Sequence, residues 1–237
     1  MIVAGKLYGV GVGPGDPELV TLKAKRILEK ADYIAMPKTA SDKDSVALSI
    51  AEEVLDTKKP ILELLFFMSF DSEVVKAGWR DSISKIKEKL DKGKDVAFIT
   101  LGDPTVYSTY MYIHKEIKNQ GYDTEIVPGI TSFCAVTAKL GISLAENRES
   151  VAVIPSAYEC KNIETILDNC DNVVMMKVSR NLPKIKEKLK EIGLMDKAVL
   201  VSKCGFPDEI IQYDIEKAME KELSYFTTMI VKRKGVK

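Results

Sequence analysis

The chain has 237 residues, of which 46% are hydrophobic and 30% are charged, so it holds enough apolar material for a sizeable core rather than a disordered chain. Its 35 basic residues balance its 35 acidic residues, and this neutrality argues against a nucleic-acid partner. No apolar run approaches the roughly 18 residues of a membrane span, and the N-terminus lacks the apolar segment of a signal peptide. We therefore expect a cytoplasmic protein of one or two domains, with neither a membrane nor a nucleic-acid partner.

The four cysteines predict no metal site. Cys134, Cys160, Cys170 and Cys204 are scattered without a C-x-x-C pair, and His114 is the only histidine. A structural zinc site usually requires closer cysteine pairs together with histidines. We expect reduced thiols that are mostly buried, in a chain that binds no metal of its own.

Short strand-like runs alternate with helical patterns, which predicts an α/β protein. Several of these runs are continuously apolar, as expected for strands that are covered on both faces. Helices are predicted over 75–90 and 182–192, where apolar residues recur every three or four positions. The last expected strand ends in charged residues, which favours the edge of a sheet. The expected strands are 6–12, 32–36, 95–101, 124–127, 151–154, 172–178, 198–202 and 224–234.

A polar, glycine-containing break at 118–123 separates the two regions in which the apolar runs are densest. A boundary at this break divides the chain into halves of similar size. We therefore expect two α/β domains, over residues 1–120 and 121–237.

The first of three notable turns lies in GVGVGPGDPEL (9–19), where a strand runs through glycines into a helix. Pro14 and Asp16 break the G-x-G-x-x-G dinucleotide pattern, and no G-K-[ST] follows as in a Walker A loop. Asp16 is placed to cap the helix, with Pro17 at its first position, so a carboxylate stands where a phosphate would bind. The turn indicates close backbone approach to a ligand without phosphate; the alternative is a plain strand-to-helix turn.

The second turn, in FITLGDPTVYSTYMY (98–112), repeats this order. An apolar strand ends in Gly102, and a capping Asp103 and Pro104 precede the next helix. Ligands of open α/β sheets bind at the carboxyl ends of the strands. Two such turns in one sheet would line the two sides of one cleft.

The third turn lies in EIVPGITSFCAVTAKLG (125–141). A strand ends at Pro128-Gly129, and Thr131 and Ser132 precede a helix of small residues. Threonine and serine at a helix start are usually caps. Taken alone, this turn predicts only a capped helix.

Together these segments resemble the S-adenosylmethionine-dependent tetrapyrrole methylases, in an order and spacing that agree over nearly the whole chain. The family resemblance lies in residues 11–34, 100–107, 127–133 and 172–177. Within the family, the resemblance is closest to the C20-methyltransferases of corrin-ring (cobalamin) synthesis, which act on precorrin-2 or on its cobalt form, cobalt-factor II. This closer resemblance lies in residues 64–79, 96–112, 127–146 and 151–155.

The resemblance implies two α/β domains with the donor and a tetrapyrrole substrate in the cleft between them, and a homodimer. The donor, S-adenosylmethionine, has no phosphate, which agrees with the character of the turns. Asp103 would accept hydrogen bonds from the donor or serve only as a cap, and Met176 would pack on the adenine or be a core residue. The segment 202–206 departs from the family pattern, which leaves two positions for the last contact. The implied donor contacts are Pro14, Leu101, Gly102, Asp103, Val106, Thr131, Ser132, Met176 and Cys204 or Gly205, with Tyr107 beside them.

Methyl transfer to a ring carbon is an in-line displacement, which depends on positioning and on a dry cleft rather than on a strong base. We therefore expect no catalytic triad and assign no catalytic residue. The carboxylates of the macrocycle call for lysine or arginine. The candidates near predicted strand ends or loops are Lys38, Arg80, Lys177 and Arg180, each alternatively a surface charge.

Two alternative functions remain at this point. One is a methylase of the same family that acts at a different carbon, and the other is a non-catalytic protein that binds the donor or the pigment. The sequence leaves open whether the acceptor contains cobalt.

Overall fold

The computed structural model describes residues 3–38, 45–66, 72–155 and 162–236, and it divides into two compact units, Met1–Thr131 and Ser132–Lys237. The division falls later than the expected boundary at residue 120. The reason is that β5 (Thr124–Val127) pairs with β1 (Leu7–Gly11) in the sheet of the first unit. The polar break at 118–123 is therefore a turn that leads into β5, and not a linker.

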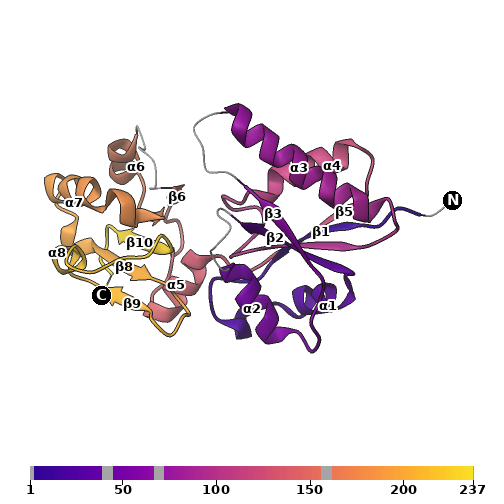
Figure 1. Ribbon diagram of the computed structural model, residues 1–237. Helices are drawn as coiled ribbons and strands as arrows, with labels where there is room; N and C mark the ends of the chain where they lie inside the picture. Colours follow the sequence, from indigo (N-terminus) through magenta and orange to yellow (C-terminus); the bar gives the residue numbers. More distant parts are fainter. Residues whose placement is uncertain (1–2, 39–44, 67–71, 156–161, 237) are drawn as a thin grey trace. The chain divides into compact units, whose positions relative to one another are not determined.

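The first unit is a doubly wound sheet whose five strands are all parallel, in the order β3-β2-β4-β1-β5. Helices α1 and α2 cover one face of the sheet, and α3 and α4 cover the other (Figure 1). The remaining strands of this unit are β2 (Tyr33–Lys38), β3 (Ile61–Leu65) and β4 (Val96–Thr100). The helices are α1 (Leu22–Lys30), α2 (Val46–Val54), α3 (Ser72–Leu90) and α4 (Tyr110–Asn119), with a 3-10 turn at Pro17–Leu19.

The central strands β1 and β4 of this sheet are buried on both faces, which explains their continuous apolar runs. Val96 and Phe98 of β4 pack toward α3 and α4, and the alternate residues Ala97 and Ile99 are buried as well. Each large side chain buried in this way contributes roughly 1.5–3 kcal/mol. The predicted apolar stripe of α3 is confirmed by Ile86, which is fully buried in the same core.

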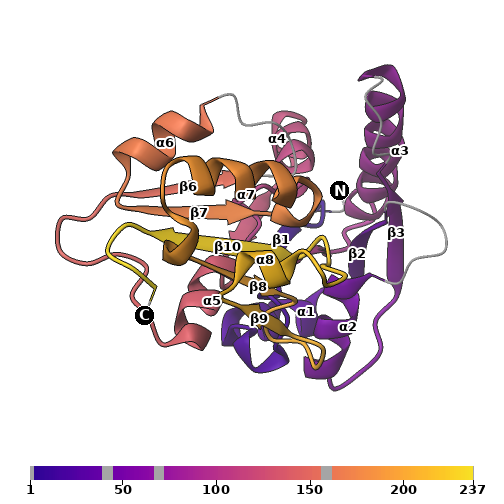
Figure 2. The ribbon, with the colours of Figure 1, turned by 90° about the vertical axis from the view of Figure 1, so that its left-hand side faces the viewer.

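The second unit contains a mixed sheet in the order β6-β7-β10-β8-β9, in which only β6 and β7 are parallel. Helices α6, α7 and α8 contribute to the core on one face, and α5 contacts β10 (Figure 2). The strands are β6 (Val151–Pro155), β7 (Asn172–Met176), β8 (Ala198–Ser202), β9 (Ile210–Gln212) and β10 (Thr227–Lys232). The helices are α5 (Ser132–Leu140), α6 (Ile163–Asn169), α7 (Leu182–Glu191) and α8 (Ile215–Ala218), with 3-10 turns at Val178–Asn181 and Met195–Lys197.

The expected edge position of the last strand is wrong, because β10 lies between β7 and β8. Its terminal Lys232 is buried, and its ammonium group donates to the carbonyl oxygen of Ser143 at 2.8 Å and lies 3.9 Å from a carboxylate oxygen of Glu149. Because Lys232 contacts groups of the same unit, its charge does not indicate an edge strand. No strand was predicted at β3 or β9, each of which lies at one edge of its sheet; β5 and β6 form the opposite edges.

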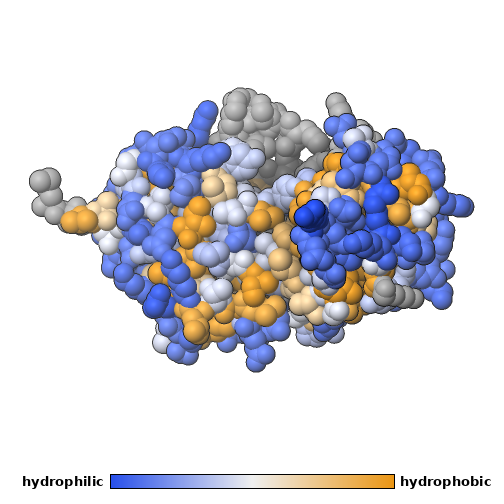
Figure 3. Space-filling model, turned by 180° about the vertical axis from the view of Figure 1, so that it is seen from behind, coloured by the Kyte–Doolittle hydropathy of each residue, from blue (hydrophilic) through white to orange (hydrophobic). Residues whose placement is uncertain are grey.

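The cysteines differ in exposure. Cys204 is buried, Cys170 is half-buried and Cys134 is exposed, so the expectation of mostly buried thiols is only partly correct; Cys160 lies outside the described residues. No described group of three or more histidine, cysteine or acidic residues is arranged to hold a metal. None of the helices seen in the described ranges is long and apolar enough to cross a membrane. Seen from behind, the surface is largely hydrophilic with scattered apolar patches (Figure 3).

Candidate active site

Three turns of the first unit meet at one end of its sheet. Strands β4, β1 and β5 are neighbours and run parallel, so their carboxyl ends lie side by side. The turns that follow these strands are the three that the sequence singled out. We call residues 12–16, 101–109 and 128–131 the turn cluster.

The first two turns are joined through their main chains. Gly13 and Gly102 form an isolated antiparallel bridge, in which the N–H of Gly102 donates to the carbonyl of Gly13 at 2.7 Å and the reverse bond measures 3.3 Å. Gly13 has a φ of 78° and Gly102 a φ of 72°, in the left-handed region that favours glycine. The repeated glycines therefore permit this pairing of two turns.

The third turn packs so closely on the other two that side chains are excluded. A Cβ atom on Gly129 would lie 2.2 Å from the carbonyl oxygen of Gly102. A Cβ atom on Gly11 would lie 2.5 Å from the same oxygen and 2.7 Å from the nitrogen of Gly129. Main-chain groups consequently form much of the turn cluster.

Asp103 ties the second turn to the third. Its Oδ1 accepts from the N–H of Thr105 at 2.8 Å and from the hydroxyl of the same residue, and its Oδ2 accepts from the N–H of Gly129 at 3.0 Å. Asp103 is only 8% exposed. The expected cap of the next helix is wrong, because α4 begins at Tyr110 and Asp103 instead caps the turn itself. Asp16 does cap as expected, but for the 3-10 turn at Pro17–Leu19.

Two features of the turn cluster point to a ligand. The hydroxyl oxygen of Thr131 is buried and has no hydrogen-bond partner in the described part of the chain. Tyr107 has a φ of 48°, a conformation that costs energy for a non-glycine residue, and its side chain is 46% exposed. Unsatisfied buried polar atoms and strained residues are uncommon and gather at functional sites. Of the other predicted contacts, Pro14 is buried, and Leu101 and Val106 are half-buried in the same turns.

The predicted residues of the second unit form two groups beside β10. Met176 ends β7 opposite Thr228 of β10, and the hydroxyl of Thr228 lies 3.4 Å from that of Ser132. Cys204 and Gly205 follow β8 on the other side of β10, and the N–H of Gly205 donates to Glu209 at 2.9 Å. The structure thus brings Ser132 near Met176, whereas Cys204 and Gly205 lie after the end of β8.

Behind the turn cluster, α4 carries a polar pair in which Tyr110 is buried and His114 is half-buried. Burial raises the pKa of Tyr110, whose hydroxyl lies 3.2 Å from Nδ1 of His114. Burial also lowers the pKa of His114, so its ring is neutral near pH 7. The ring of Tyr110 covers Gly9, where a Cβ would lie 2.1 Å from ring carbons. His114 packs against the same ring, with its ring centroid 5.6 Å from that of Tyr110.

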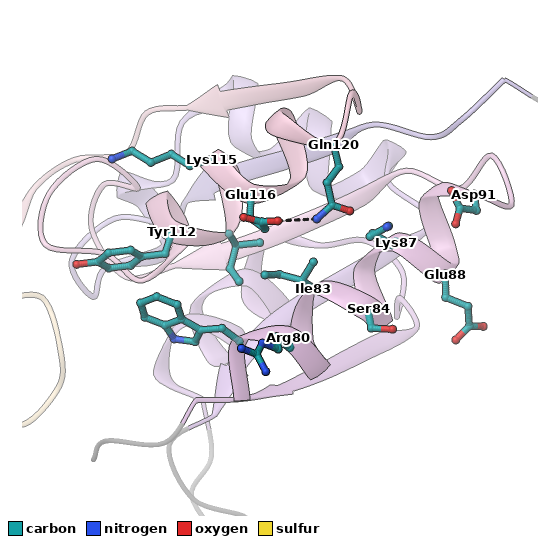
Figure 4. Close-up of a pocket in the computed structure, with 12 residues that line it drawn as sticks. Arg80, Ile83, Ser84, Lys87, Glu88, Asp91, Tyr112, Lys115, Glu116 and Gln120 are labelled. Atoms are coloured by element: carbon teal, nitrogen blue, oxygen red, sulfur yellow. Dashed lines mark hydrogen bonds between the residues drawn. The ribbon is translucent and has the colours of Figure 1, made fainter. Parts of the chain in front are cut away.

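A hollow lies elsewhere, between α3 and α4 (Figure 4). It measures about 870 Å³, and a stack of Trp79 on Tyr112, with ring centroids 4.6 Å apart, contributes to its lining. Arg80 also lines it, and the amide of Gln120 donates to Glu116 at 2.7 Å. None of the predicted donor contacts lines this hollow.

The sequence matches the model of the Tetrapyrrole (Corrin/Porphyrin) Methylases over residues 6–217. The chain belongs to this family. This methylase is 39% identical over 232 residues to a protein of Methanocaldococcus jannaschii named as a probable cobalt-precorrin-2 C(20)-methyltransferase, with 96% of each chain covered. It is 34% identical over 230 residues to the cobalt-precorrin-2 C(20)-methyltransferase of Salmonella typhimurium, with 97% of each covered.

Solved structures agree with the fold of the methylase. A uroporphyrin-III-C-methyltransferase from Thermus thermophilus superposes with a TM-score of 0.72 at 24% identity, covering 97% of this chain and 94% of that one. A structure of uroporphyrin-III C-methyltransferase from the same organism, complexed with S-adenosyl homocysteine, has a TM-score of 0.68 at 19% identity and covers 97% and 98% of the two chains.

Several residues around the predicted contacts of the methylase escaped the sequence analysis. Thr105 follows Asp103 by two positions, which is the spacing of an Asx turn and was a usable signal. Thr228 had no local signal, because its place opposite Met176 depends on the pairing of distant strands. Gly11 and Gly129 were visible as glycines, but their mutual contact was not.

Proposed function

We propose that this chain is an S-adenosylmethionine-dependent C-methyltransferase that methylates C20 of precorrin-2 or of its cobalt form, cobalt-factor II, in corrin synthesis. The observation that carries the proposal is the likeness to two cobalt-precorrin-2 C(20)-methyltransferases over nearly the full length of each chain. The alternatives are a family member that acts at another carbon and a protein that binds donor or pigment without turnover.

The turn cluster fits the donor of this reaction. It offers main-chain groups of residues 101–103, a buried hydroxyl on Thr131 that lacks a partner among the described residues, and an exposed ring on Tyr107. The carboxylate of Asp16 caps the 3-10 turn Pro17–Leu19 and stands where a phosphate would bind. The arrangement therefore suits an aminoacyl nucleoside better than a phosphate. We propose that these groups hold S-adenosylmethionine, which supplies an electrophilic methyl group on a sulfonium. The contacts assigned by resemblance to Ser132, Met176 and the 204–205 segment stay a separate prediction for the second unit.

In this proposal, the residues of the turn cluster act by orienting the methyl donor. Transfer of the methyl group would break its bond to sulfur, which keeps the electron pair, while the ring carbon would form the new carbon–carbon bond with an electron pair of the macrocycle and then lose its proton. Close packing holds the main chain around Gly102 and Gly129, so this part of the site does not have to reorganise when the donor binds. A fixed donor favours a collinear approach of its methyl group to the ring carbon. Because positive charge on sulfur disappears, a site that excludes water favours the transition state. Asp103 holds two turns together through hydrogen bonds, and this is a positioning role.

A paired turnover assay tests the proposal. The purified protein and S-adenosylmethionine are incubated without oxygen, once with cobalt-factor II and once with metal-free precorrin-2, and the products are weighed by mass spectrometry. A gain of one methyl group, assigned to C20 by carbon NMR, is the expected result, and the faster acceptor identifies the natural substrate. A methyl group at another carbon would show that the protein is a different methyltransferase of the same family. Donor binding without any product would show that it binds the donor without catalysing the transfer.

Two properties of the whole protein are also proposals. We propose that it is a homodimer and that it resides in the cytoplasm. Analytical ultracentrifugation of the purified chain tests the first, and fractionation of cells tests the second. A sedimentation coefficient of a single chain at micromolar concentration would contradict the dimer.

A further inference from the structure

The loop that follows β8 has an unusual main-chain conformation. Lys203 has a φ of 53° and Gly205 a φ of 85°, so two of three successive residues lie in the left-handed region. This conformation costs energy for lysine, whereas glycine tolerates it. The N–H of Phe206 donates to the carbonyl of Lys203 at 3.0 Å and closes a turn around Gly205. Backbone strain of this kind persists only where the surroundings fix it, and it gathers at functional sites.

One carboxylate holds the centre of this turn. The N–H of Gly205 donates to Oε2 of Glu209 at 2.9 Å, and the N–H of Glu209 itself donates to the carbonyl of Phe206 at 3.1 Å. The side chain of Glu209 is only 13% exposed. A hydrogen bond from an N–H to a carboxylate is stronger than one between neutral groups. We call residues 203–209 the Glu209 loop.

The same carboxylate also contacts α5. Its Oε1 lies 3.1 Å from the ammonium nitrogen of Lys139, in the last turn of that helix. The helix begins at Ser132, whose hydroxyl lies 3.4 Å from that of Thr228. Glu209 therefore connects two parts of the second unit that the family resemblance assigns to the donor, the 204–205 segment and the helix that begins at Ser132.

The bond to Glu209 fixes the direction of a whole peptide group. The peptide between Cys204 and Gly205 is planar and trans, so its N–H and its carbonyl point in opposite directions. While Glu209 accepts from this N–H, the peptide plane cannot turn without losing the hydrogen bond. Glycine by itself adopts left-handed and right-handed conformations at similar cost. The side chain of Glu209 therefore supplies the restraint that a glycine at 205 does not.

The neighbouring acid has a weaker hold on the loop. Asp208 pairs with the side chain of Lys203, but the two side chains are 60% and 38% exposed. Ion pairs that are open to water contribute little to stability. Asp208 is therefore a matched control, since it lies beside Glu209 and carries the same charge.

We infer that Glu209 is a positioning residue for the methyl donor, because it holds the peptide between Cys204 and Gly205 in the orientation that receives S-adenosylmethionine; this inference rests on the proposed function. The loop is then ordered before the donor arrives, so donor binding does not have to order it. Lys139 holds the second oxygen of the same carboxylate. Glu209 acts through the main chain and takes no part in bond making.

The test compares Glu209→Ala with the wild type and with Asp208→Asn. Donor binding is measured by calorimetric titration with S-adenosylmethionine, binding of cobalt-factor II without donor by visible absorbance, and unfolding by circular dichroism. Glu209→Ala is expected to weaken donor binding roughly tenfold, because the unrestrained glycine turn must then be ordered on binding. Binding of cobalt-factor II is expected to stay unchanged. Asp208→Asn is expected to bind both ligands as the wild type does.

Graded variants separate positioning from charge and from folding. Glu209→Asp keeps the charge on a side chain one carbon shorter, which cannot reach the N–H of Gly205 in the same geometry, so donor affinity is expected to fall several-fold. Glu209→Gln keeps the length and an acceptor oxygen and is expected to restore most of the affinity. Lys139→Met removes only the contact with α5, and because Lys139 is 54% exposed, a loss of at most about threefold is expected.

The outcomes distinguish this inference from the proposed function. Wild type that binds the donor without turnover, with weaker donor binding in Glu209→Ala, supports the inference and removes the enzyme. Equal donor binding by the wild type and Glu209→Ala overturns the inference and leaves the enzyme. An equal loss in Asp208→Asn, or a parallel loss of donor and macrocycle binding with a lower unfolding midpoint, also overturns it.

Two further results complete the test. If Glu209→Ala does not fold, Glu209→Asp and Glu209→Gln decide in its place: weaker donor binding by the first supports the inference, and equal binding by the two overturns it. Wild type that does not bind S-adenosylmethionine overturns both the inference and the proposed function.

Discussion

The two units arrange the carboxyl ends of their strands in different ways. In the first unit, three parallel neighbours end together, and their turns touch through main-chain atoms of Gly11, Gly102 and Gly129. In the second unit, β10 begins between the ends of β7 and β8, and the loops present side chains such as Lys177 and Tyr225. At the carboxyl ends of its strands, the parallel sheet thus presents main-chain groups, whereas the mixed sheet presents side chains. Substitutions at the turn glycines of the first unit should therefore act through folding geometry, and those at Lys177 or Tyr225 of the second unit through side-chain chemistry.

The largest expected effect comes from Gly129→Ala. Its new methyl would lie 2.2 Å from the carbonyl of Gly102, so the turns must separate, at a cost of roughly 1–3 kcal/mol. We also expect donor binding to fall at least tenfold, measured by calorimetric titration with S-adenosylmethionine. Gly121→Ala is the control, because its added methyl meets nothing within 4 Å and only the backbone is strained. Unchanged stability in Gly129→Ala would contradict the close packing of the turns, and unchanged donor affinity would move the donor away from them.

Asp103→Ala is expected to have the next largest effect. The N–H groups of Thr105 and Gly129, which are only partly buried, would lose their charged acceptor, at a cost of roughly 1–3 kcal/mol. Donor affinity should fall together with thermal stability, and Asp103→Asn should lie between the two. Loss of stability with full donor affinity would remove Asp103 from the proposed donor site.

Acid should weaken the second unit through Glu149. The ammonium of Lys234, then the amide of Asn172 and the N–H of Glu146, lower the pKa of Glu149 to about 2. Because the pKa is lower in the folded state, this stabilisation is complete above the ordinary value near 4.5 and is lost as the pH falls toward 2. Glu149→Gln should flatten the decline of stability over this range, measured by circular dichroism.

The control for this titration is Glu187→Gln, at an exposed position of α7. Its stability curve should parallel that of the wild type. A Glu149→Gln curve that also parallels the wild type would show that the network around Lys234 does not stabilise the fold.

Thr131→Val separates ligand binding from folding. The variant removes a buried hydroxyl that has no partner among the described residues, so stability should stay level or rise slightly. Donor affinity should fall by roughly threefold to tenfold, the worth of one hydrogen bond. Thr131→Ser keeps the hydroxyl and should retain donor affinity. Equal affinity in wild type and Thr131→Val would assign the hydroxyl to packing alone.

The smallest expected effect is the pH response of His114. Burial lowers its pKa, so the folded state favours the neutral ring. The stabilisation is therefore present above the unfolded value of about 6.5 and is lost as the pH falls through the folded pKa. His114→Gln should reduce the slope of stability against pH on the acidic side of neutrality. An unchanged slope would contradict the partial burial of this ring.

Much of the first unit was predictable because its signals are local. Glycine, aspartate and proline at the strand ends predicted the turns, and parallel pairing placed their ends together. Two of the four edge strands were harder: β3 reads ILELL, with apolar residues at nearly every position, although only Leu64 is buried in the folded sheet. The position of β10 was misread because Lys232 finds partners inside the unit, which no local pattern reveals.

The roles of individual site residues depend on distant contacts. Asp103 appeared as a helix cap, but its bond to Gly129 joins positions 26 residues apart. Lys177 and Arg180 were two of four equal candidates, and the ring of Tyr225 that lies beside both comes from a different part of the chain. Residue types and turns can be read locally, whereas pairing across the fold requires the folded chain.

Trp79 gives the comparison of the two units a built-in optical probe. It is the only tryptophan of the chain, and it lies in the first unit, stacked on Tyr112 at an interplanar angle of 26°. Its fluorescence therefore follows the unfolding of the first unit alone, while far-ultraviolet circular dichroism follows both sheets. If the two units unfold independently, the two signals will give separate midpoints in one denaturant titration; if they unfold together, the curves will coincide.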